Sequence, residues 1–214
     1  MDQELKDWLK EALNKNPALL QRARAGDFMA AQQWIFQLSS SMTAAFENVV
    51  YKSTEFLEAT NKAQADIVRK VIAPVIEQVK SVSDALSYES LQKNLVKKGL
   101  LFSPAYPDRV EDRLKAVVAG GLKKIFEEED LEAGLNIFRS GFQQVVDSSP
   151  RSAITQTASS AEEKGYSLKG RRVPAVYADA CSYCQEAAHT SFSLKEGLNF
   201  AGFHDYCGCR LEIL

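Results

Sequence analysis

The chain has 214 residues, with 26 Lys and Arg against 28 Asp and Glu and a formal net charge of −2. This length suits one or two domains with a sizeable core, and the balanced charge on both sides of Pro150 argues against binding nucleic acid through phosphate contacts. The charged N-terminus lacks the apolar segment of a signal peptide, and no apolar run is long enough to span a membrane. We therefore expect an intracellular protein, in which clustered cysteines favour a metal over disulfides.

The first part of the chain, residues 1–148, has the pattern of a helical region. Apolar residues recur three and four positions apart from Leu5 to Leu13, which predicts an amphipathic helix. Asn16 and Pro17 resemble an N-cap followed by proline at the first helical position. Gly26 should end that short helix, and Asp27 is suited to cap the next one.

The next stretch predicts one long helix over about residues 28–73. No glycine or proline interrupts it, an apolar stripe runs from Ile35 to Val71, and Pro74 should kink or end it. A helix of this length cannot bury its stripe alone. We expect it to pack in a bundle or a coiled coil, either with other helices of the chain or with a partner, including a second copy.

Capping residues and glycines then delimit shorter helices: from Ser83 or Asp84 to about Gly99, from Asp108, from Asp130, and from Ser149-Pro150 to about Gly165. The Gly120-Gly121 pair lies within the second of these and could introduce a hinge or a break. The acidic run 127–130 is interpreted as a solvated helix end with a cap, because consecutive helical side chains do not converge on a cation. We expect the helix after Asp130 to direct an apolar face inward, made of Leu135, Phe138, Phe142 and Val145.

All four cysteines and both histidines lie in the last 34 residues. The pattern C-x2-C…H-x2-C-x-C offers five soft donors, of which four complete a tetrahedral zinc site. We predict structural Zn²⁺ bound by four of Cys181, Cys184, His204, Cys207 and Cys209. The preferred set omits Cys207. The alternative is that the cysteines are reduced core thiols. His189 is expected on a helix surface rather than on the ion.

Two short runs near the metal ligands have strand character, 172–177 and 209–214. They could pair as a small antiparallel ribbon beside the metal. Such a ribbon is too small to be stable by burial alone, and structural zinc can supply roughly 10 kcal/mol of folding free energy. The predicted fold is therefore mainly α, with long helices over residues 1–148 and a zinc-stabilised β element in a C-terminal segment, residues 149–214.

The segment 149–214 resembles the C-terminal part of the phage Mu F-like family, the minor head (head morphogenesis) proteins of tailed phages. The features that carry the resemblance are a helix at Ser152–Lys164, a strand with Arg172-Val173, the pair Cys181/Cys184, a variable loop at Ser191–Gly202, and Phe203-His204-Asp205-Tyr206-Cys207-Gly208-Cys209. They cover roughly the last third of the chain. The resemblance implies a component of the virion or procapsid, near the portal, that is present in the host cytoplasm during assembly.

Three classes of function are consistent with these patterns. The first is a non-enzymatic structural protein that binds portal, capsid or scaffolding proteins during head assembly. The second is a small metal-dependent hydrolase, which the supply of only two histidines disfavours, since one is assigned to the metal. The third is a nucleic-acid-associated zinc knuckle, which the absence of a basic surface disfavours. We favour the first class, with no catalytic residue and no membrane contact.

Overall fold

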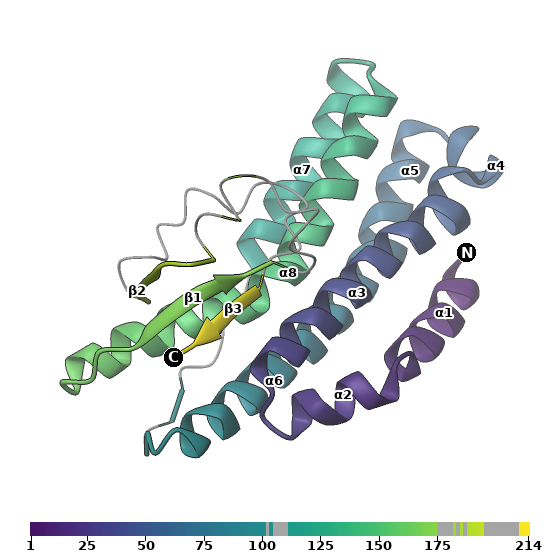
Figure 1. Ribbon diagram of the computed structural model, residues 1–214. Coiled ribbons are helices and arrows are strands. Elements are labelled where there is room, and N and C mark those ends of the chain that lie inside the picture. Colours follow the sequence, from purple (N-terminus) through teal and green to yellow (C-terminus); the bar gives the residue numbers. More distant parts are fainter. Residues whose placement is uncertain (102, 105–110, 175–181, 183–184, 186–187, 195–209) are drawn as a thin grey trace. The chain divides into compact units, whose positions relative to one another are not determined.

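The structure is a computed structural model that describes residues 1–101, 103–104, 111–174, 182, 185, 188–194 and 210–214. Within these ranges the protein is mainly helical, with a small three-stranded antiparallel sheet near the C-terminus (Figure 1). This confirms the predicted fold class at the level of a mainly α protein with a small C-terminal β element. No helix in the described ranges is both long enough and apolar enough to cross a membrane.

The helices are α1 (Asp2–Asn14), α2 (Pro17–Arg24), α3 (Phe28–Phe46), α4 (Thr54–Leu57), α5 (Asn61–Ile67), α6 (Ala73–Lys97), α7 (Glu111–Glu127) and α8 (Leu131–Glu163), with π-helical turns η1 (Glu47–Tyr51) and η2 (Val68–Ile72). The strands are β1 (Lys169–Val173), β2 (Ser191–Ser193) and β3 (Arg210–Ile213).

The chain divides into two compact units. Unit 1 comprises Met1–Pro17, Ile35–Ser83 and Arg109–Ser148, and unit 2 comprises Ala18–Trp34, Asp84–Asp108 and Ser149–Leu214. Helices α2, α3, α6 and α8 contribute residues to both units.

The amphipathic helix predicted around Leu5 to Leu13 and the short helix predicted to start at Pro17 are both present. Helix α1 buries Leu5 on its inner face, and α2 begins at Pro17. Gly26 follows α2 with a φ of 92°, a left-handed conformation that glycine adopts readily. Asp27 then caps α3, because its Oδ1 accepts a hydrogen bond of 3.0 Å from the backbone N–H of Ala30.

The prediction of a single helix over residues 28–73 is wrong, because the chain turns between η1 and α5. Ser53 Oγ accepts a hydrogen bond of 3.2 Å from the backbone N–H of Phe56, and Thr60 Oγ1 accepts one of 3.4 Å from Ala63. Serine and threonine at these positions satisfy backbone donors that have no partner inside a helix. The two hydroxyl caps therefore start new helices without any glycine or proline.

Pro150 lies inside α8, although the sequence predicted a helix start there. Pro74, which was predicted to kink or end a helix, is the second residue of α6. Segments α5, η2 and α6 follow one another without a gap, and the π-helical turn η2 ends directly before α6. A π-helical turn changes the hydrogen-bond pattern next to Pro74, which cannot donate one. Helix α8 likewise continues through Pro150. No helix therefore starts at Ser149 or Ser83, since Ser83 lies within α6.

The predicted helix ends at Gly99 and Gly165 are confirmed. Their φ angles are 77° and 81°. The backbone N–H of Leu100 donates to the carbonyl of Leu95 at 3.0 Å, and a similar bond closes the last turn of α8. These are the hydrogen bonds that terminate a helix at a left-handed residue.

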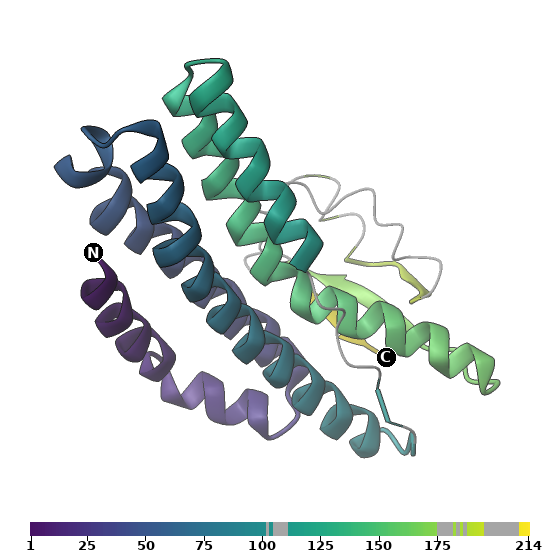
Figure 2. The same cartoon turned by 180° about the vertical axis from the view of Figure 1, so that it is seen from behind.

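In unit 1, α7 lies alongside the first part of α8, as both views show (Figures 1 and 2), and glycines bring the two helices close together. A Cβ atom on Gly121 would clash with the ring of Phe138, and one on Gly141 would lie 2.6 Å from Val117 Cγ1. Helix α7 continues through the Gly120-Gly121 pair without the break that the sequence allowed. The predicted inward residues of α8 are all buried: Leu135, Phe138, Phe142 and Val145.

The cysteine segment and its flanking strands

All five predicted metal ligands lie outside the described residues: Cys181, Cys184, His204, Cys207 and Cys209. Zinc binding therefore stays a prediction. Among the residues that the structure does describe, no three Cys, His, Asp or Glu side chains group as metal ligands would. His189 is exposed in a turn before β2, rather than on the predicted helix surface. The described part of this region is the sheet that flanks the cysteines.

The sheet has the strand order β2-β1-β3, and its central strand β1 is antiparallel to both neighbours. Arg172 pairs with Leu211 and Val173 pairs with Arg210. The predicted antiparallel pairing with the C-terminal strand is thus confirmed, although β1 begins at Lys169, before the predicted start at Arg172, and ends at Val173. Strand β2, which pairs with the other edge of β1, was not predicted because a three-residue strand carries too little pattern.

The pairing of β1 with β3 brings the first residue of β3 opposite the last residue of β1. The chain leaves β1 after Val173, and Cys181 and Cys184 lie in the segment between β1 and β2. It enters β3 at Arg210, the partner of Val173, directly after Cys209. The two donor segments are therefore anchored at the same end of β1.

The sheet itself buries few side chains. Gly170 on β1 allows a close approach, since a Cβ there would lie 2.5 Å from Leu194 Cδ2. Leu211 and Ile213 on β3 are buried, and so is Arg172, whose guanidinium is an unusual group to find fully buried. Exposed cross-strand ion pairs such as the one between β1 and β3 contribute at most about 1 kcal/mol.

Gln32 on α3 is a contact to the sheet that sequence reasoning missed. Its side-chain Nε2 donates a hydrogen bond of 2.7 Å to the carbonyl oxygen of Leu211, and the backbone N–H of Leu211 donates one of 2.8 Å to Gln32 Oε1. The two residues are 179 positions apart in the chain. Nothing in the local sequence distinguishes Gln32 from an ordinary polar helix residue.

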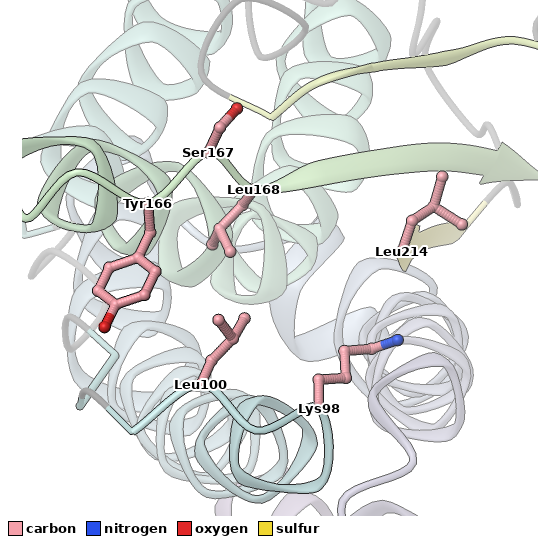
Figure 3. Close-up of a pocket in the computed structure, with 6 residues that line it drawn as sticks. All are labelled: Lys98, Leu100, Tyr166, Ser167, Leu168 and Leu214. Atoms are coloured by element: carbon pink, nitrogen blue, oxygen red, sulfur yellow. The ribbon is translucent and has the colours of Figure 1, made fainter.

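Unit 2 also contains an open pocket of about 410 Å³, formed between the end of α6, the connection from α8 to β1, and the end of β3 (Figure 3). It is lined by Lys98, Leu100, Tyr166, Ser167, Leu168 and Leu214. Leu100 and Leu168 point toward each other across it. The lining offers the ammonium group of Lys98, the hydroxyls of Tyr166 and Ser167 and apolar surface, but no imidazole, thiol or side-chain carboxylate.

Unit 1 contains a separate polar cluster around Arg139. The Arg139 Nε donates to Glu47 Oε2 at 2.9 Å and its Nη1 donates to Glu132 Oε1 at 2.8 Å. Its guanidinium carbon lies 6.0 Å from the centroid of the Tyr51 ring. The hydrogen bond from Arg139 lowers the pKa of Glu47, while complete burial raises the pKa of Tyr51. A charged, paired carboxylate and a neutral phenol fit a stabilising role rather than proton transfer.

Comparison of the chain with models of known families, with curated proteins and with solved structures finds no match. The class of protein is therefore defined by the fold alone. It is a mainly helical protein with a small C-terminal sheet, and the sequence between its strands is rich in cysteine. The likeness of residues 149–214 to the Mu F-like family rests on the motif.

Proposed function

We propose that this chain is a minor structural protein of a tailed phage that binds portal, capsid or scaffolding proteins during head assembly. One observation carries the proposal: the order of a helix, a strand with Arg172-Val173, the two cysteine clusters and a terminal strand. The occurrence of helix α8, strand β1 and strand β3 in this order along the chain supports the proposal. The protein acts by binding, without a reaction, and belongs to the virion or procapsid.

Within this proposal, structural Zn²⁺ joins the two cysteine clusters. Four of Cys181, Cys184, His204, Cys207 and Cys209 hold the ion and close the segments between the strands. The register that brings Arg210 opposite Val173 supports this role. The small buried area of the sheet supports it too, because short strands need a further source of stability.

The exposed apolar residues of unit 2 support a role in protein binding. Apart from Leu57, the large apolar side chains that are exposed in the described part of the chain are Val96, Leu101, Tyr166 and Leu214. Tyr166 and Leu214 line the pocket, and Leu101 directly follows a lining residue. Exposed apolar surface of this kind is typical of protein interfaces.

Binding of the purified chain to the portal, capsid and scaffolding proteins of its own phage tests the proposal. We expect a stoichiometric complex with at least one of them by size-exclusion chromatography with light scattering. Tyr166→Glu should weaken that complex about tenfold, a loss of about 1.4 kcal/mol. Leu57→Glu, a matched change at an exposed apolar residue of unit 1, should not. The proposal fails if none of these proteins binds.

A further inference from the structure

The pocket of unit 2 combines apolar surface with a lysine that makes no ion pair. In Figure 3 the apolar side chains of Leu100 and Leu168 lie between Tyr166 and Lys98. The exposed Lys98 ammonium forms no ion pair with any carboxylate in the described part of the chain. By contrast, Lys93 on α6 is paired with Glu89 at 2.6 Å. The pocket thus offers a cation for which the described part of the protein supplies no counter-charge.

The side chains around the pocket are positively charged, although the chain as a whole has a formal net charge of −2. Lys97 and Lys169 adjoin lining residues in the sequence and are exposed, as Lys98 is. None of the lining residues, and none of their immediate neighbours in the sequence, has a carboxylate side chain. This local excess of lysine is complementary to a negatively charged surface.

The apolar part of the pocket is suited to an anchoring side chain. Leu101, next to the lining residue Leu100, is 85% exposed, and Val96 on the last turn of α6 is 53% exposed. In protein interfaces a few apolar side chains that enter pockets supply most of the affinity. Charges at the rim mainly set the association rate and the choice of partner.

We propose that this pocket binds an acidic segment of a phage-head protein, which packs an apolar side chain against Leu100 and Leu168 and places a carboxylate on Lys98. The inference rests on the proposed function and specifies the chemistry of the partner. A basic segment would be repelled by the lysines. An uncharged apolar segment would cover the Lys98 ammonium without pairing it, which costs free energy. An acidic segment with an apolar anchor satisfies both parts of the pocket.

The test uses the whole chain and whichever of the portal, capsid and scaffolding proteins forms the complex. Isothermal titration calorimetry measures the Kd at about 50 mM and about 500 mM NaCl, because salt screens exposed charges. Lys98→Glu reverses the charge at the pocket, and Lys98→Arg keeps it. Lys10→Glu is the matched control, since it makes the same charge change at an exposed lysine on α1 in unit 1. Circular dichroism verifies that each variant keeps its helices.

The charge and the apolar contact should respond differently to salt. Lys98→Glu should raise the Kd about tenfold at the lower salt concentration and much less at the higher one. Lys98→Arg and Lys10→Glu should leave the Kd within about twofold of the unmodified chain, as expected where no charge contact is lost. Leu100→Asn should raise the Kd about tenfold at both salt concentrations, because an apolar contact is not screened. The Lys98 variants keep the test decisive should Leu100→Asn not fold, since Lys98 is exposed.

The outcomes separate this inference from the proposed function. A complex whose Kd responds equally to Lys98→Glu and Lys10→Glu overturns the acidic partner and leaves the role in head assembly standing. A Kd that falls in Lys98→Glu overturns it too, because it would reveal a basic partner. The unmodified chain should be monomeric by light scattering, and a dimer that Lys98→Glu and Leu100→Asn dissociate would show that a second copy occupies the pocket. Failure of every head protein to bind overturns both proposals.

Discussion

The hairpin of α7 with the first part of α8 and the three-stranded sheet obtain their stability in different ways. In the hairpin, Gly121 and Gly141 let side chains of the facing helix reach the backbone, and the rings of Phe138 and Phe142 stack with centroids 5.3 Å apart. In the sheet, the longest strand has five residues. A helical hairpin can be stabilised by close apolar packing alone, whereas so short a sheet depends on hydrogen bonds at its edge and on the proposed metal.

The largest difference between the sheet and the helical hairpin should appear when the proposed metal is lost. Cys181→Ser should disorder the sheet while most helicity remains, because structural zinc contributes roughly 10 kcal/mol to the folding of small elements. Limited proteolysis should cut only beyond α8, and circular dichroism should change little. His189→Ala is the control, since we assign this exposed residue no role at the metal. An intact, protease-resistant C-terminus in Cys181→Ser would contradict the prediction.

Adding a methyl group where α7 packs against α8 should have the next largest effect on stability. Gly121→Ala forces a Cβ atom against the ring of Phe138, and we expect the free energy of unfolding to fall by about 2 to 3 kcal/mol. Gly120→Ala is the matched control, because its Cβ would lie 3.9 Å from Ile137 Cγ2, an ordinary contact. It should raise the free energy by about 0.5 to 1 kcal/mol through helix propensity. Chemical denaturation measures both, and equal effects would refute the close-packing account.

The ion pair of Glu47 and Arg139 should make the stability of unit 1 depend on pH. The two side chains are 24% and 22% exposed, and Glu47→Gln should lower the free energy of unfolding at pH 7 by about 1 to 2 kcal/mol. Because the pKa of folded Glu47 is lowered, the stabilisation is complete above the unfolded value of about 4.3. It is lost as the pH falls through the lower folded pKa.

Urea denaturation of the unmodified chain and Glu47→Gln between pH 3 and pH 7 measures this dependence. The two curves should approach each other only below about pH 4.3. Glu127→Gln, an exposed position on α7, provides the control and should follow the unmodified chain. A difference that stays constant down to pH 3 would show that the ion pair is not its cause.

The smallest expected effect is the loss of a helix cap. Asp130 Oδ1 accepts a hydrogen bond of 2.9 Å from the backbone N–H of Ala133 at the start of α8. Asp130→Ala should lower the free energy of unfolding by about 1 kcal/mol, whereas Asp130→Asn keeps an acceptor and should lower it little. Thermal unfolding of the two variants side by side distinguishes a cap from a charge effect, since a charge effect would make them equal.

The local signals in the sequence were sufficient for much of this fold. The caps at Asp27 and Asp130 and the helix ends at Gly99 and Gly165 could be read directly, because each is a property of a few adjacent residues. The pairing of β1 with β3 could also be anticipated. The caps at Ser53 and Thr60 carry the same kind of signal, but the uninterrupted apolar stripe outweighed them in the prediction.

Features set by tertiary packing could not be read in this way. Pro150 has the sequence context of a helix start, yet α8 passes through it. Gly121 looked like a weak point in a helix, although its missing Cβ is what admits Phe138. The pairing of Gln32 with Leu211 depends on two residues 179 positions apart, so no local pattern could reveal it.

The central claim is that one zinc ion joins the two cysteine clusters next to the sheet. Native mass spectrometry of the chain, purified under reducing conditions without added chelator, tests it most directly. The account predicts one zinc ion per chain, and predicts that Cys181→Ser or Cys184→Ser loses it while His189→Ala keeps it. A metal-free chain with an ordered sheet would contradict the account.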